Sequence, residues 1–189
     1  MFYRSFLAID LPPTVQAQVD GLIHVLRRRD SGNAIRWVQP TQAHVTMVFL
    51  GNQVPGELIV ALRAAGGRVS AKFPPLLLAT TVLGVFPPVG PTRVIYLGCA
   101  GTGLTMVRRL HHEFIELVAQ LGVAVERRSW QPHITLGRAK SPTFMPLDNI
   151  GSAPEKFTAS AVTLYQSTLT PSGPRYEQLA CFPLGSVAS

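Results

Sequence analysis

The chain has 189 residues, of which 47% are hydrophobic and 14% charged, and this composition excludes a disordered protein. Lys and Arg number 17 against 10 Asp and Glu, so the net charge of +7 favours a polyanionic partner such as RNA over a purely solubilising role. The sequence has no apolar stretch near the roughly 18 residues of a membrane span, and its N-terminal apolar run is too short for a secretory signal. We therefore expect a cytoplasmic monomer with one domain over residues 1–189.

Apolar residues recur with strand or helix periodicity along the chain. The expected strands are residues 2–9, 44–50, 76–85, 93–99, 132–138, 159–167 and 176–182. The expected helices are residues 11–30, 55–73 and 104–121, each bounded by Pro or Gly. Residues 37–40 and 141–154 are interpreted as connections, and residues 170–174 as a hairpin-like turn. Because strands follow one another in pairs at several places, the pattern favours an α+β fold over a regular βαβ array.

The two cysteines, Cys99 and Cys181, show no CxxC spacing and no accompanying set of metal ligands. They also lie far apart in the sequence. We therefore interpret both as reduced, buried thiols of a cytoplasmic protein.

Two segments of the chain carry the same tripeptide pattern inside a predicted strand. Residues 42–48 contain His44 and Thr46, and residues 131–137 contain His133 and Thr135. Because side chains alternate along a strand, the His and Thr of each segment share one face, and the β-branched residue between them points into the core. Two copies in similar settings predict half-units packed with pseudo-twofold symmetry, so that both His-Thr pairs face one cleft.

This arrangement suits in-line displacement at phosphorus, which needs a base on one side and an acid on the other. Histidine, with an unperturbed pKa of about 6.5, supplies both roles near neutral pH. Threonine hydroxyls donate to the non-bridging phosphate oxygens as charge develops there. A cyclic phosphate contains its own leaving oxygen, so we expect neither a metal nor a cofactor.

At these residues the chain resembles the two-histidine (2H) phosphoesterase superfamily, and within it the RNA 2′,3′-cyclic phosphodiesterases, also called 2′-5′ RNA ligases. The likeness includes residues 5–12, 44–51, 93–98, 132–138, 164–167 and 175–176. It implies a bilobal α+β fold of two intertwined lobes, in which two antiparallel sheets flank a central cleft and helices lie outside. It further implies that His44 and His133 are the catalytic acid–base pair and that Thr46 and Thr135 bind the substrate phosphate.

The resemblance also places Arg138 at the phosphate and Phe49 near the base of the terminal nucleotide. Each of these residues follows a motif histidine by five positions, and an odd offset puts them on the opposite face of a regular strand. A bulge or the end of the strand must therefore bring them round. The alternatives are that Arg138 is a solvated surface cation and that Phe49 is a core aromatic.

The resulting hypothesis is a metal-independent RNA 2′,3′-cyclic phosphodiesterase, a hydrolase that leaves 2′-phosphate ends and needs no obligate protein partner. One histidine removes a proton from water and the other protonates the departing 3′ oxygen; we take His133 as the base and His44 as the acid, and the sequence leaves the reverse assignment open. A 5′-hydroxyl in place of the water gives 2′-5′ ligation. Two alternatives stay open. One is a non-catalytic nucleotide- or RNA-binding module, and the other is a phosphodiesterase of a small cyclic nucleotide.

Other candidate residues have a plainer interpretation. The histidine pair 111–112 lacks the HExxH order of a zinc site and is interpreted as solvated helix surface. Trp37 and Trp130 each precede a motif strand, and core packing is favoured over base stacking for both. The basic run 127–128 near the second motif is a candidate contact for an RNA backbone, although such runs are usually solvated faces.

Overall fold

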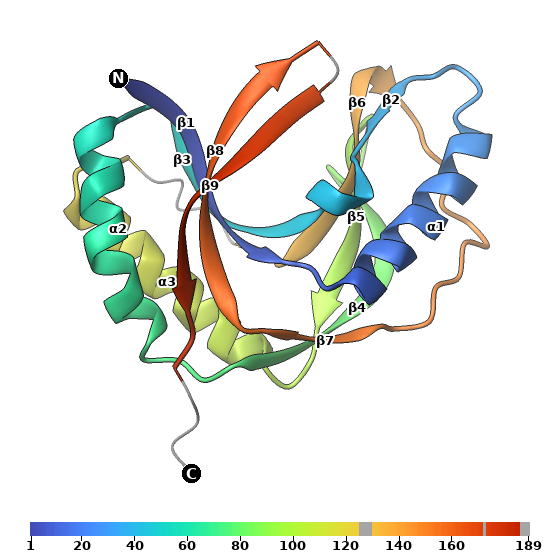
Figure 1. The fold of residues 1–189 in the computed structure, drawn as a ribbon. Coiled ribbons are helices and arrows are strands. Elements are labelled where there is room, and N and C mark those ends of the chain that lie inside the picture. The colour runs from blue at the N-terminus through green and yellow to red at the C-terminus, as the bar shows by residue number, and fades with distance from the viewer. Residues whose placement is uncertain (125–129, 172, 186–189) are drawn as a thin grey trace.

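Strands and three helices make up the fold (Figure 1). The strands are β1 (Phe2–Asp10), β2 (Ile35–Trp37), β3 (His44–Pro55), β4 (Leu76–Phe86), β5 (Thr92–Ala100), β6 (His133–Thr143), β7 (Lys156–Ala159), β8 (Ala161–Thr170) and β9 (Gly173–Pro183). The helices are α1 (Pro13–Arg29), α2 (Gly56–Ser70) and α3 (Leu104–Gln120), and Pro40–Gln42 form a short 3-10 turn, η1. These elements belong to a computed structural model that describes residues 1–124, 130–171 and 173–185.

The sheet has two halves that meet at the motif strands. Within the described residues the strand order is β7-β4-β5-β6-β3-β1-β8-β9, with β2 added beside β6, and the pairings are antiparallel. The two halves are connected through β3 and β6 by the pair Val45 and Ile134. The α+β class and the antiparallel strands are therefore confirmed, and the two expected sheets are joined edge to edge. The pseudo-twofold symmetry between the two halves and the assignment of residues 1–189 to one domain stay predictions.

The helices lie outside the sheet, as expected. α2 flanks the half formed by β1, β3, β8 and β9, α3 contacts both β3 and β4 and so spans the two halves, and α1 lies beside the other half (Figure 1). In α3 the buried residues Val107, Leu110, Phe114 and Val118 recur at helical spacing and turn one face inward. Each such side chain contributes about 1.5–3 kcal/mol by burial. Among the described residues, no helix combines the length and the apolar character needed to cross a membrane.

β2 is a strand where the sequence indicated a connection. Ile35 to Trp37 pair with the part of β6 that follows the second motif. Gly137 makes this possible, because a side chain at that position would collide with Ile35 and Trp37. Three residues are too short a run for periodicity to identify, and the partner strand decides their conformation.

The predicted strand 159–167 corresponds to β8, except that its first residue, Ala159, belongs to a separate strand, β7, with a different partner. β7 pairs with β4 in one half of the sheet, and after Ser160 the chain continues into β8, which pairs with β1 in the other half. β6 also continues to Thr143, into the segment expected to be a connection. The change of partner depends on tertiary pairing, which local periodicity does not reveal.

The interpretation of both cysteines as buried is wrong for Cys181. Cys99 is buried in β5, whereas Cys181 is exposed on β9. β9 is an edge strand, so alternate residues face solvent even where the sequence is apolar. Both thiols are free.

Candidate active site

The two motif strands are neighbours at the centre of the sheet. Val45 and Ile134, the middle residues of the two motifs, form an antiparallel pair and are fully buried. This register sets the histidine of each motif level with the threonine of the other. Side-chain alternation turns all four of these residues to the opposite face, where they are partly exposed.

Both imidazole rings are held in the same orientation by the backbone. Nδ1 of His44 lies 2.8 Å from the carbonyl oxygen of Gln42, and Nδ1 of His133 lies 2.8 Å from that of Gln131. A carbonyl can only accept, so Nδ1 carries the proton in both rings and Nε2 is the atom free to exchange protons. Nε2 of His44 also lies 3.1 Å from Thr46 Oγ1.

Two aromatic rings pack against each histidine and limit its contact with water. The rings beside His44 are Phe6, stacked at 4.8 Å between centroids, and Tyr176, edge-on at 5.5 Å. Those beside His133 are Phe86 at 5.2 Å and Tyr96 at 5.5 Å, both edge-on. Each imidazole is therefore flanked by two aromatic rings.

This burial changes the protonation of both rings. It lowers the pKa of His44 below the ordinary histidine value, although the Gln42 carbonyl and the Asp10 carboxylate act to raise it. Burial likewise lowers the pKa of His133; the Gln131 carbonyl opposes this shift, and among the described residues no carboxylate does. The Arg138 guanidinium lowers the pKa of both rings, so its charge lies within reach of both.

Matching β-bulges explain how residues five positions after each histidine reach the motif face. In β3, the residues on either side of Met47 pair with consecutive residues of β1. In β6, the residues on either side of Leu136 pair with consecutive residues of β5. The extra residue reverses the alternation in each strand, so that Phe49 and Arg138 become exposed after two successive buried residues.

The structure corrects the core alternative for Phe49. Its side chain is 45% exposed, and the Arg4 guanidinium lies 4.8 Å above the ring centroid. Arg4 is itself fixed by a hydrogen bond to Asn52. Arg138 is exposed but acts electrostatically on both motif histidines. The contacts of Phe49 and Arg138 with substrate stay predictions.

Trp130 lies in the segment that leads into the second motif and forms a hydrogen bond with the backbone of the first motif. Its Nε1 donates a hydrogen bond of 3.0 Å to the backbone carbonyl of Thr46. The ring of His111 stacks on the indole at 4.3 Å with an interplanar angle of 8°. Burial lowers the pKa of His111 to about 4, with a further contribution from His112. The interpretation of His111 as solvated is therefore wrong, because the indole covers it, whereas His112 is exposed as expected.

Sequence reasoning gave no role to Asp10, Thr163 and Tyr165, which form a polar cluster beside His44. Asp10 pairs with His44 across β1 and β3. The Asp10 carboxylate accepts hydrogen bonds of 2.7 Å from the hydroxyls of Thr163 and Tyr165. The position of Asp10 at the exposed end of a buried strand was the available signal. Only the family resemblance singled out Tyr176, as part of residues 175–176.

Two adjoining hollows open beside His44. The smaller, of about 210 Å³, is lined by His44, Asp10, Tyr165 and their neighbours. The larger, of about 500 Å³, lies between β2, β6 and the β8–β9 hairpin and includes Arg138. Among the residues that the structure describes, no three His, Cys, Asp or Glu side chains gather as a metal site would require. The basic run 127–128 lies outside the described residues.

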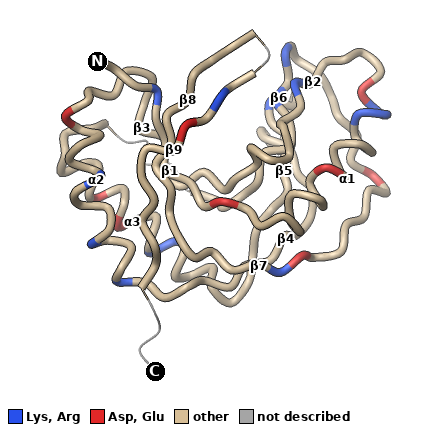
Figure 2. Tube along the Cα trace, in the orientation of Figure 1, with Lys and Arg blue, Asp and Glu red and all other residues tan. Residues whose placement is uncertain are grey.

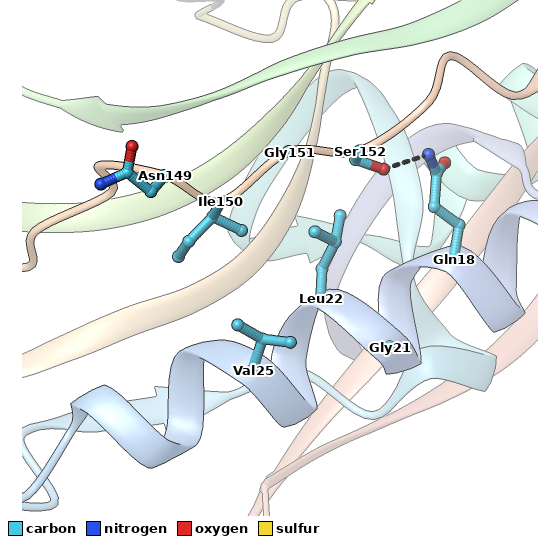
Figure 3. Close-up of a pocket in the computed structure, with 8 residues that line it drawn as sticks. All are labelled: Gln18, Gly21, Leu22, Val25, Asn149, Ile150, Gly151 and Ser152. Atoms are coloured by element: carbon cyan, nitrogen blue, oxygen red, sulfur yellow. Dashed lines mark hydrogen bonds between the residues drawn. The ribbon is translucent and has the colours of Figure 1, made fainter.

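A third pocket, of about 370 Å³, shares no lining residue with the motifs, and none of the described residues that line it is ionisable (Figure 3). It separates α1 from the segment 149–152. Gln18 of α1 donates to Ser152 Oγ and to the Ala153 carbonyl and accepts from Thr80. These bonds fix the long connection against α1, and the pocket offers no group for acid–base chemistry.

Comparisons with known proteins agree with this geometry. The profile of the 2′-5′ RNA ligase superfamily matches residues 11–170. An RNA 2′,3′-cyclic phosphodiesterase of Thermotoga maritima is 30% identical over 182 residues, which cover 93% of this chain and 92% of that protein. Another, of Geobacillus stearothermophilus, is 31% identical over 153 residues, or 78% of this chain, and the match spans 47% of that longer protein.

A solved structure shows the same architecture. The crystal structure of a Thermus thermophilus protein aligns with a TM-score of 0.79 and 27% identity, covering 97% of this chain and 98% of that one. The family match covers most of the chain and contains both histidine motifs. The protein therefore belongs to the 2′-5′ RNA ligase superfamily of two-histidine phosphoesterases.

Proposed function

We propose that this protein hydrolyses RNA 2′,3′-cyclic phosphate ends to 2′-phosphate ends, using His44 and His133 and no metal. The observation that carries the proposal is the paired tether: each histidine donates its Nδ1 proton to a carbonyl two residues earlier and thereby leaves Nε2 available. Relatives that carry the name RNA 2′,3′-cyclic phosphodiesterase support the choice of substrate. The net charge of +7 suits an RNA partner.

The reaction uses the two Nε2 atoms in opposite senses. Nε2 of His133 takes a proton from water as the water oxygen bonds to phosphorus. The bond from phosphorus to O3′ breaks, and Nε2–H of His44 gives its proton to O3′. The product carries a 2′-phosphate and a free 3′-hydroxyl. General acid–base assistance of this kind accounts for about 10²–10⁴-fold in rate.

Asp10 distinguishes the two roles. Its carboxylate favours the protonated form of His44, against the effects of burial and of the neighbouring Arg138 and His133, and on this ground we assign His44 as the proton donor. Among the described residues no carboxylate acts on His133 in this way, and we assign it as the base. Arg138 and the hydroxyls of the two motif threonines stabilise the charge that develops on the non-bridging oxygens.

Three further features belong to the same proposal. Phe49 contacts the base of the terminal nucleotide with the exposed part of its ring. A 5′-hydroxyl that replaces the attacking water leads to 2′-5′ ligation through the same groups. The protein acts as a cytoplasmic monomer.

The test is an oligoribonucleotide with a 2′,3′-cyclic phosphate end, incubated with the protein and EDTA. We expect conversion to a 2′-phosphate end, and a loss of about 10²–10⁴-fold in kcat in both His44→Ala and His133→Ala. His24→Ala is the matched control, because His24 is exposed on α1. Chromatography of the RNA ends separates the 2′- from the 3′-phosphate.

Three results contradict the proposal. Loss of activity in EDTA that zinc or magnesium restores removes the metal-free mechanism. A 3′-phosphate product would mean that the bond from phosphorus to O2′ breaks instead of the bond to O3′. Tight binding of 2′-AMP without turnover of any cyclic phosphate favours the binding module instead.

A further inference from the structure

The larger hollow beside the histidines has an unbalanced positive charge. Arg36 of β2 and Arg138 of β6 lie directly opposite each other, and Arg175 of β9 lines the same cavity. Figure 2 shows Lys and Arg positions on β2 and β6, and one on β9. Like charges placed opposite each other destabilise a strand pair, and none of the described residues that line the cavity is Asp or Glu. The ion pair found among the described residues, Lys72–Glu113, lies elsewhere. The three arginines therefore give the cavity a positive charge that attracts an anion.

The same cavity offers aromatic surface. Trp37 and Tyr176 line it, and both are partly buried and so held in place. Trp37 lies against the backbone of Gly137, which has no side chain to displace it. Nucleobases stack on such rings without regard to sequence. A volume of about 500 Å³ lies within the range of small-ligand sites.

The cavity adjoins the smaller hollow that contains His44. Thr41, Gln42 and Tyr176 line both this cavity and the smaller hollow that contains His44. Gln42 supplies the carbonyl that holds the His44 ring. Phe49, assigned above to the terminal base, is not among the lining residues. A ligand in the cavity is therefore adjacent to the phosphate position but separate from the terminal base.

We propose that this cavity binds the second nucleotide of the RNA strand, the one immediately upstream of the nucleotide that bears the cyclic phosphate. Its base stacks against Trp37 and Tyr176, and Arg36 and Arg175 bind the phosphodiester that connects the two nucleotides. This subsite rests on the proposed function and determines its substrate class. The enzyme acts on RNA ends in preference to cyclic mononucleotides.

The test compares kcat/KM for adenosine 2′,3′-cyclic phosphate with that for the dinucleotide ApA ending in a 2′,3′-cyclic phosphate. We expect the wild type to favour the dinucleotide by about a hundredfold. Arg36→Gln and Arg175→Gln each lower this ratio by about tenfold, the effect of one charge-assisted contact. Both side chains are exposed, so the fold tolerates the change. Arg27→Gln, an exposed α1 arginine, leaves the ratio unchanged.

A wild-type ratio near one, or a ratio that neither substitution changes, overturns the subsite and leaves the proposed function intact. Substitutions that reduce joining of a 5′-hydroxyl strand without changing the hydrolysis ratio also overturn it, because the cavity then holds the other RNA. If neither substrate is hydrolysed, the proposed function fails. Tryptophan fluorescence titration with the 2′-phosphorylated dinucleotide then decides the subsite: tighter binding to wild type than to Arg36→Gln supports it, and equal binding overturns it.

Discussion

The two motif strands hold their histidines alike but surround them differently. In both, the ring donates Nδ1–H to a carbonyl two residues earlier and packs against two aromatic rings. The residue paired with each histidine on the adjacent strand differs: Asp10 of β1 pairs with His44, whereas Gly98 of β5 pairs with His133. A side chain at Gly98 would collide with Thr81 Oγ1.

The residue on the neighbouring strand distinguishes two motifs that are otherwise alike. The shared tether fixes the geometry of proton transfer in both strands. The carboxylate at one position and the glycine at the other give the two rings different electrostatic surroundings. In the proposed mechanism the acid and the base come from one tripeptide pattern, and a neighbouring strand, not the motif, supplies the charge that distinguishes them.

Arg138 is the element that the two histidines share, and its removal gives the largest expected effect. Arg138→Gln loses one donor to the developing phosphate charge and lowers kcat about 100-fold. Because the guanidinium lowers the pKa of both rings, both limbs of the pH profile of kcat/KM move to higher pH. Arg27→Gln leaves the profile in place. Movement of a single limb would contradict the shared role.

Asp10→Asn removes the charge that distinguishes the surroundings of His44 from those of His133. The carboxylate raises the pKa of His44 and has no corresponding effect at His133. Loss of that charge lowers the pKa of the acid, so the alkaline limb moves to lower pH while the acid limb stays. At pH 8 we expect a loss of about fivefold, the effect of one exposed charge pair. Asp20→Asn on α1 is the control, and a shift of the acid limb instead would exchange the assigned roles.

Trp130→Phe tests the brace from the second motif to the first. The variant keeps an aromatic ring but loses the hydrogen bond to the Thr46 carbonyl. We expect a loss of about 1 kcal/mol in the free energy of unfolding and about threefold in kcat, with KM unchanged. Urea unfolding and steady-state kinetics measure the two effects. Lower stability with unchanged kcat would limit Trp130 to a structural role.

His111→Phe gives the smallest expected effect. The folded-state pKa of His111 is about 4, below the ordinary value of 6.5. Between these values the unfolded chain binds a proton that the folded protein does not, so His111 reduces stability as the pH falls through this window. His111→Phe keeps the stack on Trp130 and should lose less stability between pH 7 and pH 4.5 than the wild type. His24→Phe is the control, and equal losses in His111→Phe and the wild type would contradict the prediction.

Much of the fold followed from the sequence because its elements are long and strongly periodic. The helix expected over residues 104–121 matches α3, in which the buried residues Val107, Leu110, Phe114 and Val118 recur at helical spacing. The three residues of β2 and the change of partner between β7 and β8 did not follow, because pairing with distant strands decides both. Cys181 was misplaced because apolar character does not reveal that a strand lies at an edge.

The sequence by itself determined the chemistry of the candidate site: two histidines, each with a threonine on the same strand face. That conclusion needed only the period of two along a strand. Tertiary structure decided the remainder. The bulges at Met47 and Leu136 turn Phe49 and Arg138 to the motif face, because strand pairing sets where an extra residue is accommodated. Folding also brings Asp10 beside one histidine, because the distance between charges in space, and not along the chain, governs their interaction.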